Sequence, residues 1–141
     1  MQRKWLPTFA ELIDRLSIHQ LKEVFIPEHK DKFDEEMKDI TSDIDAFIVD
    51  RSIPLTGELV RCIIAISQIN EHIWYNERSA RLGESQDLEL LKLTHGLNGI
   101  RNRLMNKMMH ITGQGKRVDP KTDCLAAEFK DWHMSILKEK E

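Results

Sequence analysis

The chain has 141 residues, and its 40% hydrophobic and 32% charged fractions are typical of one folded globular domain. We expect a single domain over residues 1–141, with flexible ends at about 1–6 and 138–141. The N-terminus carries no apolar leader, and the longest apolar run, Cys62–Ile66, is too short to cross a membrane. The two cysteines lack CxxC spacing, which favours free thiols and a cytoplasmic location over a disulfide-stapled secreted protein.

The net charge of −3 conceals an uneven distribution along the chain. Residues 1–60 hold 13 acids against 8 lysines and arginines, whereas no acid occurs from Lys92 to Val118. A basic surface attracts anions, but it can equally pair with the acidic 28–45 segment of the same chain. Because the chain is slightly acidic and only 6% aromatic, nucleic acid is not an expected partner.

The first half of the sequence predicts two helices. Thr8 and Glu11 form a Thr-x-x-Glu capping box that opens a helix reaching about Val24. Pro27 separates this helix from a second one, which ends at the turn 52–54. Its apolar residues recur at helical spacing: Phe33, Met37, Ile40, Ile44, Phe47 and Ile48.

The second half predicts two long helices and a shorter one. Thr56 can cap a helix that runs to about Leu82, and a fourth helix is expected from about Gln86 to Ile111. An Asp-Pro pair at 119–120 then predicts a fifth helix, which carries Leu125, Phe129, Trp132 and Ile136 on one side. Strand signals are weak, so the fold class is all-α. Short connections favour an up-and-down bundle of four to five helices.

Polar residues occupy positions that the apolar periodicity reserves for the interior. On the first, third and fourth helices these residues are Asp14, Asn70, Glu77, Arg81, Asn98 and Arg101. A buried charge without a partner costs several kcal/mol, so these groups must pair with each other or with a ligand. Two interpretations follow: a closed network that fixes helix register, or the polar wall of a pocket for an anionic or planar ligand, with Trp74 as a stacking face.

Catalytic and metal-binding signatures are weak. Acid pairs at Glu-x-x-Asp spacing resemble those with which helical nucleotide pyrophosphohydrolases hold Mg²⁺: Glu11/Asp14, Glu36/Asp39, Glu84/Asp87 and Glu128/Asp131. Several acids of the second helix, however, lie opposite its apolar face. The six histidines lack metal-ligand spacing, and the Gly-Gln-Gly turn at 113–115 follows a helix rather than a strand, as a phosphate loop would require. We therefore expect no metal and no cofactor, and these signals favour a non-enzymatic role over an enzymatic one.

The segment Thr8–Ile18, followed by Leu21 and Lys22, resembles the opening of a loosely related group of small helical bacterial and phage proteins of unknown function. That opening reads roughly GELIDKLSIL, with a lysine shortly after it. Members continue with an N-x-x-x-W-x-x-E-x-x-x-R helix and an N-x-x-R helix. Their positions here are Asn70, Trp74, Glu77 and Arg81, then Asn98 and Arg101.

This resemblance covers roughly Thr8–Lys107, apart from the middle of the second helix, and implies a phage origin, but no activity. The chain departs from the group after its last motif, where the usual basic run is reduced to Arg103 and Lys107.

The sequence leads to one main functional hypothesis and two alternatives. The main hypothesis is a non-enzymatic binder of a small anionic nucleotide or nucleotide-derived signal, such as a phage anti-defence sponge in the host cytoplasm. The expected ligand-binding residues are Asp14, Asn70, Trp74, Glu77, Arg81, Asn98, Arg101 and Lys107. The alternatives are a Mg²⁺-dependent pyrophosphohydrolase-like enzyme and a structural or interaction module with a buried polar network.

The first and fourth helices carry more apolar surface than one bundle interior needs, and the first has two apolar stripes. Phe9, Leu12, Ile13 and Leu16 form one stripe, and Ile18, Leu21 and Phe25 form another. The surplus predicts a homo-oligomer, most simply a two-fold dimer.

Overall fold

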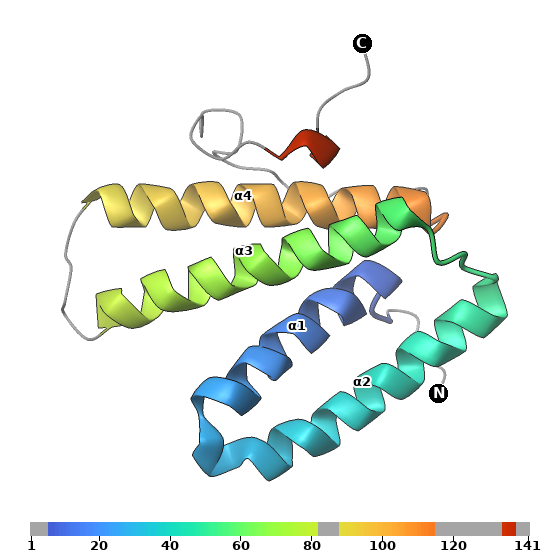
Figure 1. Ribbon diagram of the computed structural model, residues 1–141, viewed down its shortest axis with the longest axis horizontal. Helices are drawn as coiled ribbons and strands as arrows, with labels where there is room; N and C mark the ends of the chain where they lie inside the picture. The colour runs from blue at the N-terminus through green and yellow to red at the C-terminus, as the bar shows by residue number, and fades with distance from the viewer. Residues whose placement is uncertain (1–5, 82–87, 115–133, 138–141) are drawn as a thin grey trace.

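The computed structural model describes residues 6–81, 88–114 and 134–137 and shows an all-α bundle (Figure 1). Its four α-helices are α1 (Phe9–Phe25), α2 (Lys30–Arg51), α3 (Gly57–Arg81) and α4 (Leu88–Ile111). Two 3₁₀ turns, η1 (Pro27–His29) and η3 (Ser135–Leu137), complete the described elements, none of which is a strand. The predicted all-α fold class is confirmed.

The helix boundaries follow from local capping chemistry. Thr8 accepts a hydrogen bond from the Glu11 amide at 3.2 Å, and Thr56 accepts one from the Leu59 amide at 3.1 Å, so both predicted N-caps are confirmed. Ser52 closes α2 in the left-handed conformation with φ 49°. Gly113 follows α4 with φ 77°, a conformation that costs glycine little.

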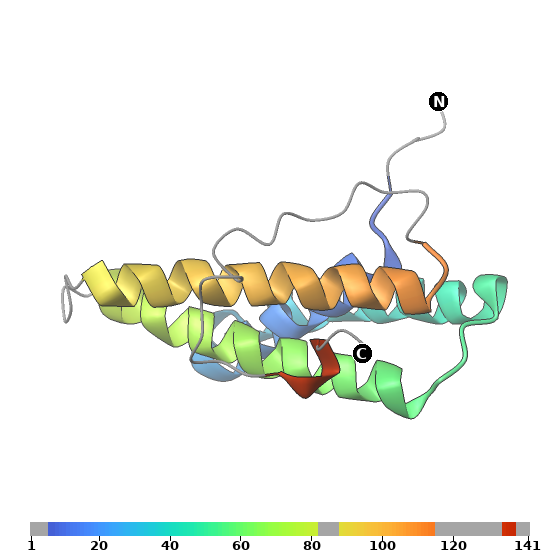
Figure 2. The same ribbon diagram turned by 90° about the horizontal axis from the view of Figure 1, so that it is seen from above.

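The helices form two hairpins with α1 in the middle. Figures 1 and 2 show α4 lying along α3, and α1 packs against both of them. Within the described part of the chain, α2 packs only against α1 and η1 and has no close backbone contact with α3 or α4. Helix α2 is therefore a flank of the bundle, whereas a regular up-and-down bundle would pack it against α3.

The core lies where α1, α3 and α4 meet. The side chains of Leu59, Ile66 and Ile69 on α3 are fully buried against those of Leu97 and Leu104 on α4. Phe9 reaches this core from α1 and makes an edge-to-face contact with Phe47 of α2, with ring centroids 6.3 Å apart. Helix α2 contributes less than the others, since only Met37 on it is buried.

The central position of α1 explains its two apolar stripes. One side of the helix faces α2, where His19 lies 2.7 Å from Glu36 and also contacts the ring of Phe33. The other side faces α3 and α4, and Phe25 meets the ring of Tyr75 on α3. Residues of both stripes thus contact other helices of the same chain, which accounts for part of the surplus apolar surface, and the oligomeric state stays a prediction.

Two sequence predictions lie outside the described residues. The expected flexible ends fall almost wholly on residues 1–5 and 138–141, and the expected fifth helix falls mostly on 115–133. Its last part is described: Ser135–Leu137 form a 3₁₀ turn whose Ile136 is buried, and the turn contacts α3 and α4. Among the described helices, none is long and apolar enough to cross a membrane.

Candidate functional site

Four of the predicted site residues meet where α1, α3 and α4 pack together: Asp14, Asn70, Asn98 and Arg101. The centre of this polar cluster is a two-pronged ion pair between α1 and α4. Arg101 donates from Nε to Asp14 Oδ1 at 2.8 Å and from Nη2 to Asp14 Oδ2 at 2.5 Å. This fork geometry fixes orientation as well as distance, so it holds α1 and α4 in one register.

Helix α3 joins the cluster through Asn70. Its Nδ2 donates to Asp14 Oδ1 at 3.0 Å and to Ser17 Oγ at 3.2 Å. Asn98 completes the set from α4, with its Oδ1 3.4 Å from Arg101 Nη1 and its Nδ2 donating to the Thr94 carbonyl at 3.1 Å. Side chains from three helices therefore satisfy one another without any external group.

The polar cluster is largely buried and its opposite charges are paired, so it restrains how α1, α3 and α4 pack together. The side chain of Asp14 is 6% exposed and that of Arg101 is 27% exposed, so the pair is largely shielded from water. Hydrogen bonding to Asp14 raises the pKa of Arg101, while burial opposes that rise. The guanidinium stays charged and its charge is matched by Asp14, with Glu77 close enough to add further negative potential.

The prediction that Glu77 faces the interior is wrong. Glu77 is exposed, although it lies near enough to Arg101 to influence its pKa. The physical reason is that the α3–α4 hairpin extends beyond the end of α1, so α1 does not cover the inward stripe of α3 there (Figure 1). Trp74 is half-buried on α3. Arg81 ends α3, and its side chain lies outside the described residues.

Lys107 lies apart from the polar cluster, which corrects its grouping with the other site residues. Its Nζ is 3.1 Å from Glu58 Oε1 at the beginning of α3. Because a helix rises about 1.5 Å per residue, Glu58 lies about 18 Å along α3 from Asn70. The resemblance grouped Lys107 with Arg101 because both lie on the fourth helix. The two side chains have different partners, however, since Lys107 pairs with Glu58 and Arg101 with Asp14.

The acidic residues of the described chain do not gather into a metal site. No group of three or more His, Cys, Asp or Glu side chains in that part of the molecule could hold an ion. Two acids of the Glu-x-x-Asp pairs are already engaged, since Asp14 binds Arg101 and Glu36 contacts His19. The pairs at 84/87 and 128/131 lie outside the described residues.

Two polar residues with structural roles were not identified from the sequence. Gln114, expected in a flexible turn, is 4% exposed, and its Oε1 accepts the Phe9 amide at 2.9 Å. It thus satisfies one of the amide groups that every helix start leaves unpaired. Ser17 follows Asp14 by three residues and therefore shares its helix face, a spacing that could have revealed it.

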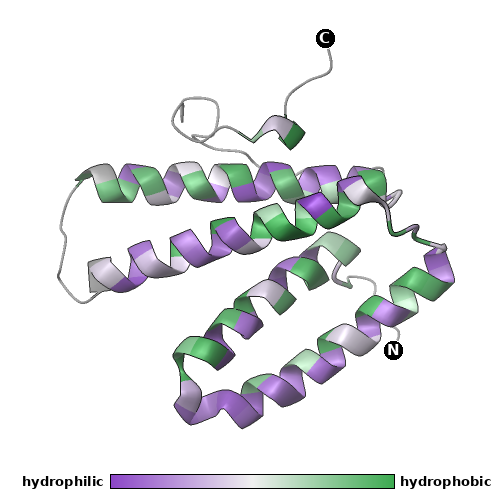
Figure 3. Cartoon of the chain, in the orientation of Figure 1, coloured by the Kyte–Doolittle hydropathy of each residue, from purple (hydrophilic) through white to green (hydrophobic). Residues whose placement is uncertain are grey.

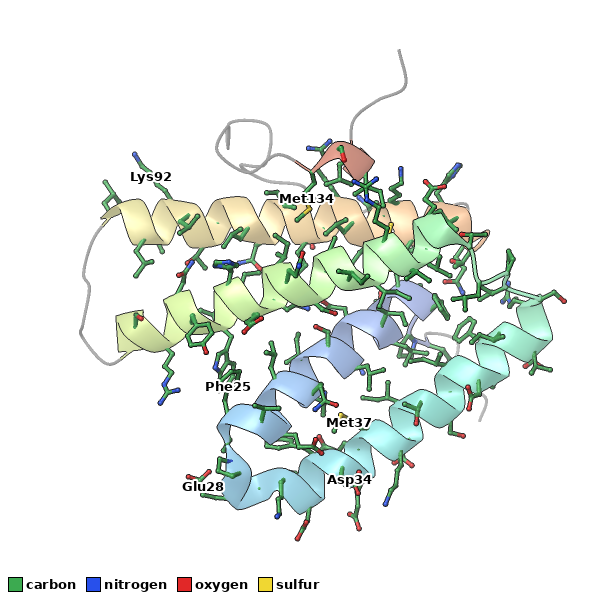
Figure 4. The ribbon with its side chains drawn as sticks, viewed as in Figure 1. Phe25, Glu28, Asp34, Met37, Lys92 and Met134 are labelled. Atoms are coloured by element: carbon green, nitrogen blue, oxygen red, sulfur yellow. The ribbon has the colours of Figure 1, made fainter. Side chains whose placement is uncertain are left out.

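A groove opens on the other side of α1, between α2 and α3. Its volume is about 500 Å³, and its apolar lining consists of Ile13 and Leu16 of α1, Met37 of α2 and Ile63 of α3. Figure 4 shows Met37 between α1 and α2. Ser17 lines the groove as well as accepting from Asn70, so the polar cluster and the groove are neighbours.

Comparison with protein-family models, with curated proteins and with solved structures finds no match to this chain.

Proposed function

We propose that this chain is a non-enzymatic helical interaction module, held in shape by the Asp14–Arg101 cluster, which presents the groove between α1, α2 and α3 to a partner. The observation that carries the proposal is the closed ion pair. Both prongs of the Arg101 fork bind Asp14, so the charge of this arginine is already neutralised by a residue of the same chain. The adjacent groove supplies the binding surface.

The test is a double-mutant cycle on the ion pair, followed by chemical denaturation. Arg101→Met should lower the free energy of unfolding by roughly 3 kcal/mol, the lower end of the usual cost of stranding a buried charge, because the guanidinium keeps some exposure. Asp14→Leu should cost a similar amount. The double variant strands neither charge, so it should be markedly more stable than the sum of the two single losses predicts.

Lys92→Met is the matched control, because Lys92 is an exposed cation on the same helix. Its unfolding midpoint should stay at the wild-type value. If Arg101→Met is as stable as Lys92→Met, Arg101 does not act as a structural partner of Asp14 and the proposal fails.

A second candidate function is the binding of a small anionic nucleotide or nucleotide-derived signal. Two observations support it: the Arg101 side chain is 27% exposed, and Trp74 Nε1 is buried without a hydrogen-bond partner in the described chain. Thermal melts with a panel of nucleotides test this candidate. A rise in Tm that Arg101→Met abolishes, without loss of stability, would favour it over the interaction module.

A further inference from the structure

Helix α3 has a second apolar face that the other described helices cover only in part. Val60, Ile63, Ile64 and Ser67 follow the i, i+3, i+4, i+7 spacing that places residues on one side of a helix. Ile63 and Ser67 line the groove, while Val60 is 38% and Ile64 is 54% exposed. This face, which we call the groove face of α3, is separate from the core face that carries Leu59, Cys62, Ile66, Ile69 and Ile73.

Helix α2 forms the opposite wall of the same groove. Met37, Thr41, Ile44 and Ile48 share one of its sides by helical spacing. Met37 and Thr41 line the groove, and Ile48 is 41% exposed. Because α2 and α3 have no close backbone contact, their apolar walls stay apart above the floor that α1 provides.

The charges around the groove are mainly negative. Its rim includes Glu23 of α1 and Asp34 of α2, and the one lysine among its lining residues, Lys38, is 3.0 Å from Asp34. Helix α2 as a whole carries eight acids against four lysines and arginines in KDKFDEEMKDITSDIDAFIVDR. The hydrophilic character of its first turns is visible in Figure 3. The carboxylates of Glu23 and Asp34 on the rim favour a cationic partner over an anionic one.

We propose that the groove binds a cationic amphipathic α-helix of a partner protein, which completes a four-helix arrangement around α1. An apolar floor between two helical walls fits the side chains that a helix presents at i, i+3, i+4 and i+7. Lysines or arginines on the flanks of that helix would meet Glu23 and Asp34. This inference rests on the proposed interaction function and specifies the chemistry of the partner.

The experiment uses the full chain and two synthetic helical peptides of about 18 residues. Both carry leucine at i, i+3, i+4 and i+7, but one has lysine and the other glutamate at the remaining positions. Fluorescence anisotropy should show that the Leu/Lys peptide binds and that the Leu/Glu peptide binds at least about tenfold more weakly. A preference for the Leu/Glu peptide, or no binding of either, would overturn the proposal.

The chain supplies a matched pair of variants for locating the peptide. Ile64 on the groove face of α3 and Leu91 on α4 are each 54% exposed. Ile64→Ser should weaken binding of the Leu/Lys peptide by about tenfold, because Ile64 adds exposed apolar surface to the face of α3 from which Ile63 and Ser67 line the groove. Leu91→Ser should leave binding within about twofold. Equal effects of the two substitutions would mean that the peptide binds elsewhere, which contradicts the proposal.

Light scattering of the same proteins tells whether the groove binds a second copy of this chain or a different protein. A wild-type dimer that Ile64→Ser converts to a monomer would place another copy of this chain in the groove and overturn the choice of a cationic partner. A failure of the peptides leaves the double-mutant cycle on Asp14 and Arg101 unaffected. The two experiments therefore tell a wrong partner from a wrong proposed function.

Discussion

The two faces of α3 carry similar residues but differ in how far they are buried. The core face is buried against α1 and α4, with Leu59 and Ile66 at 1% and 0% exposure, whereas Ile64 on the groove face is 54% exposed. Each face also has a polar member, Asn70 on the core face and Ser67 on the groove face. The neighbouring helices therefore determine which apolar stripe of α3 becomes part of the core. Three pairs of substitutions on this helix test the contrast between its two faces.

The largest effect is expected for a pair of isoleucines two positions apart. Ile66→Ala should lower the free energy of unfolding by roughly 2–5 kcal/mol, because it removes fully buried methyl groups and leaves a cavity. Ile64→Ala should change it by less than about 0.5 kcal/mol, as exposed substitutions usually do. Urea denaturation measures both. A large loss for Ile64→Ala would show that the groove face is covered in the isolated protein.

An intermediate effect is expected for the two polar residues. Asn70→Ala should cost roughly 1–3 kcal/mol, because Asp14 and Ser17 lose a donor in a buried setting. Ser67→Ala should be nearly neutral, since the Ser67 hydroxyl only bonds back to the Ile63 carbonyl within α3. The same denaturation series compares them. Equal costs for both variants would mean that Asn70 contributes no more than a local helix contact.

The smallest effect concerns thiol chemistry on the two faces. Cys62 is 0% exposed, and burial raises the pKa of its thiol. In a Cys124→Ser background, a thiol reagent should react with Cys62 only on unfolding, whereas a cysteine introduced by Ser67→Cys should react in the folded protein. Rapid modification of Cys62 in native conditions would indicate that the core face opens.

The raised pKa of Cys62 also has a consequence for stability. The unfolded chain ionises this thiol near its usual value of 9.0, while the folded chain holds the proton to higher pH. The unfolded state then binds fewer protons, so stability falls as pH rises above about 9 and is constant with respect to this group below that value. Cys62→Ala should remove that part of the slope.

The sequence predicted the positions of those site residues that helical spacing alone places. It did not predict the positions that depend on how the helices pack. Periodicity put Asp14 and Asn70 in the interior, and both are 4% exposed. The same argument failed for Glu77, because periodicity finds a helix face without knowing where the neighbouring helix ends. It also could not distinguish a pocket from a closed pair, since that depends on how closely Arg101 approaches Asp14.

Local sequence patterns were sufficient to predict α1 to α4 and their approximate ends, because capping side chains and turn residues act over three or four positions. Thr8, Thr56 and Ser52 each stand at a helix boundary as their chemistry predicts. Only the tertiary structure decided that α1 lies in the middle, that α2 stays on the flank, and that Gln114 supports Phe9 across 105 positions. These features depend on which helix faces meet in the folded chain. Spacing along the sequence does not specify such contacts between distant residues.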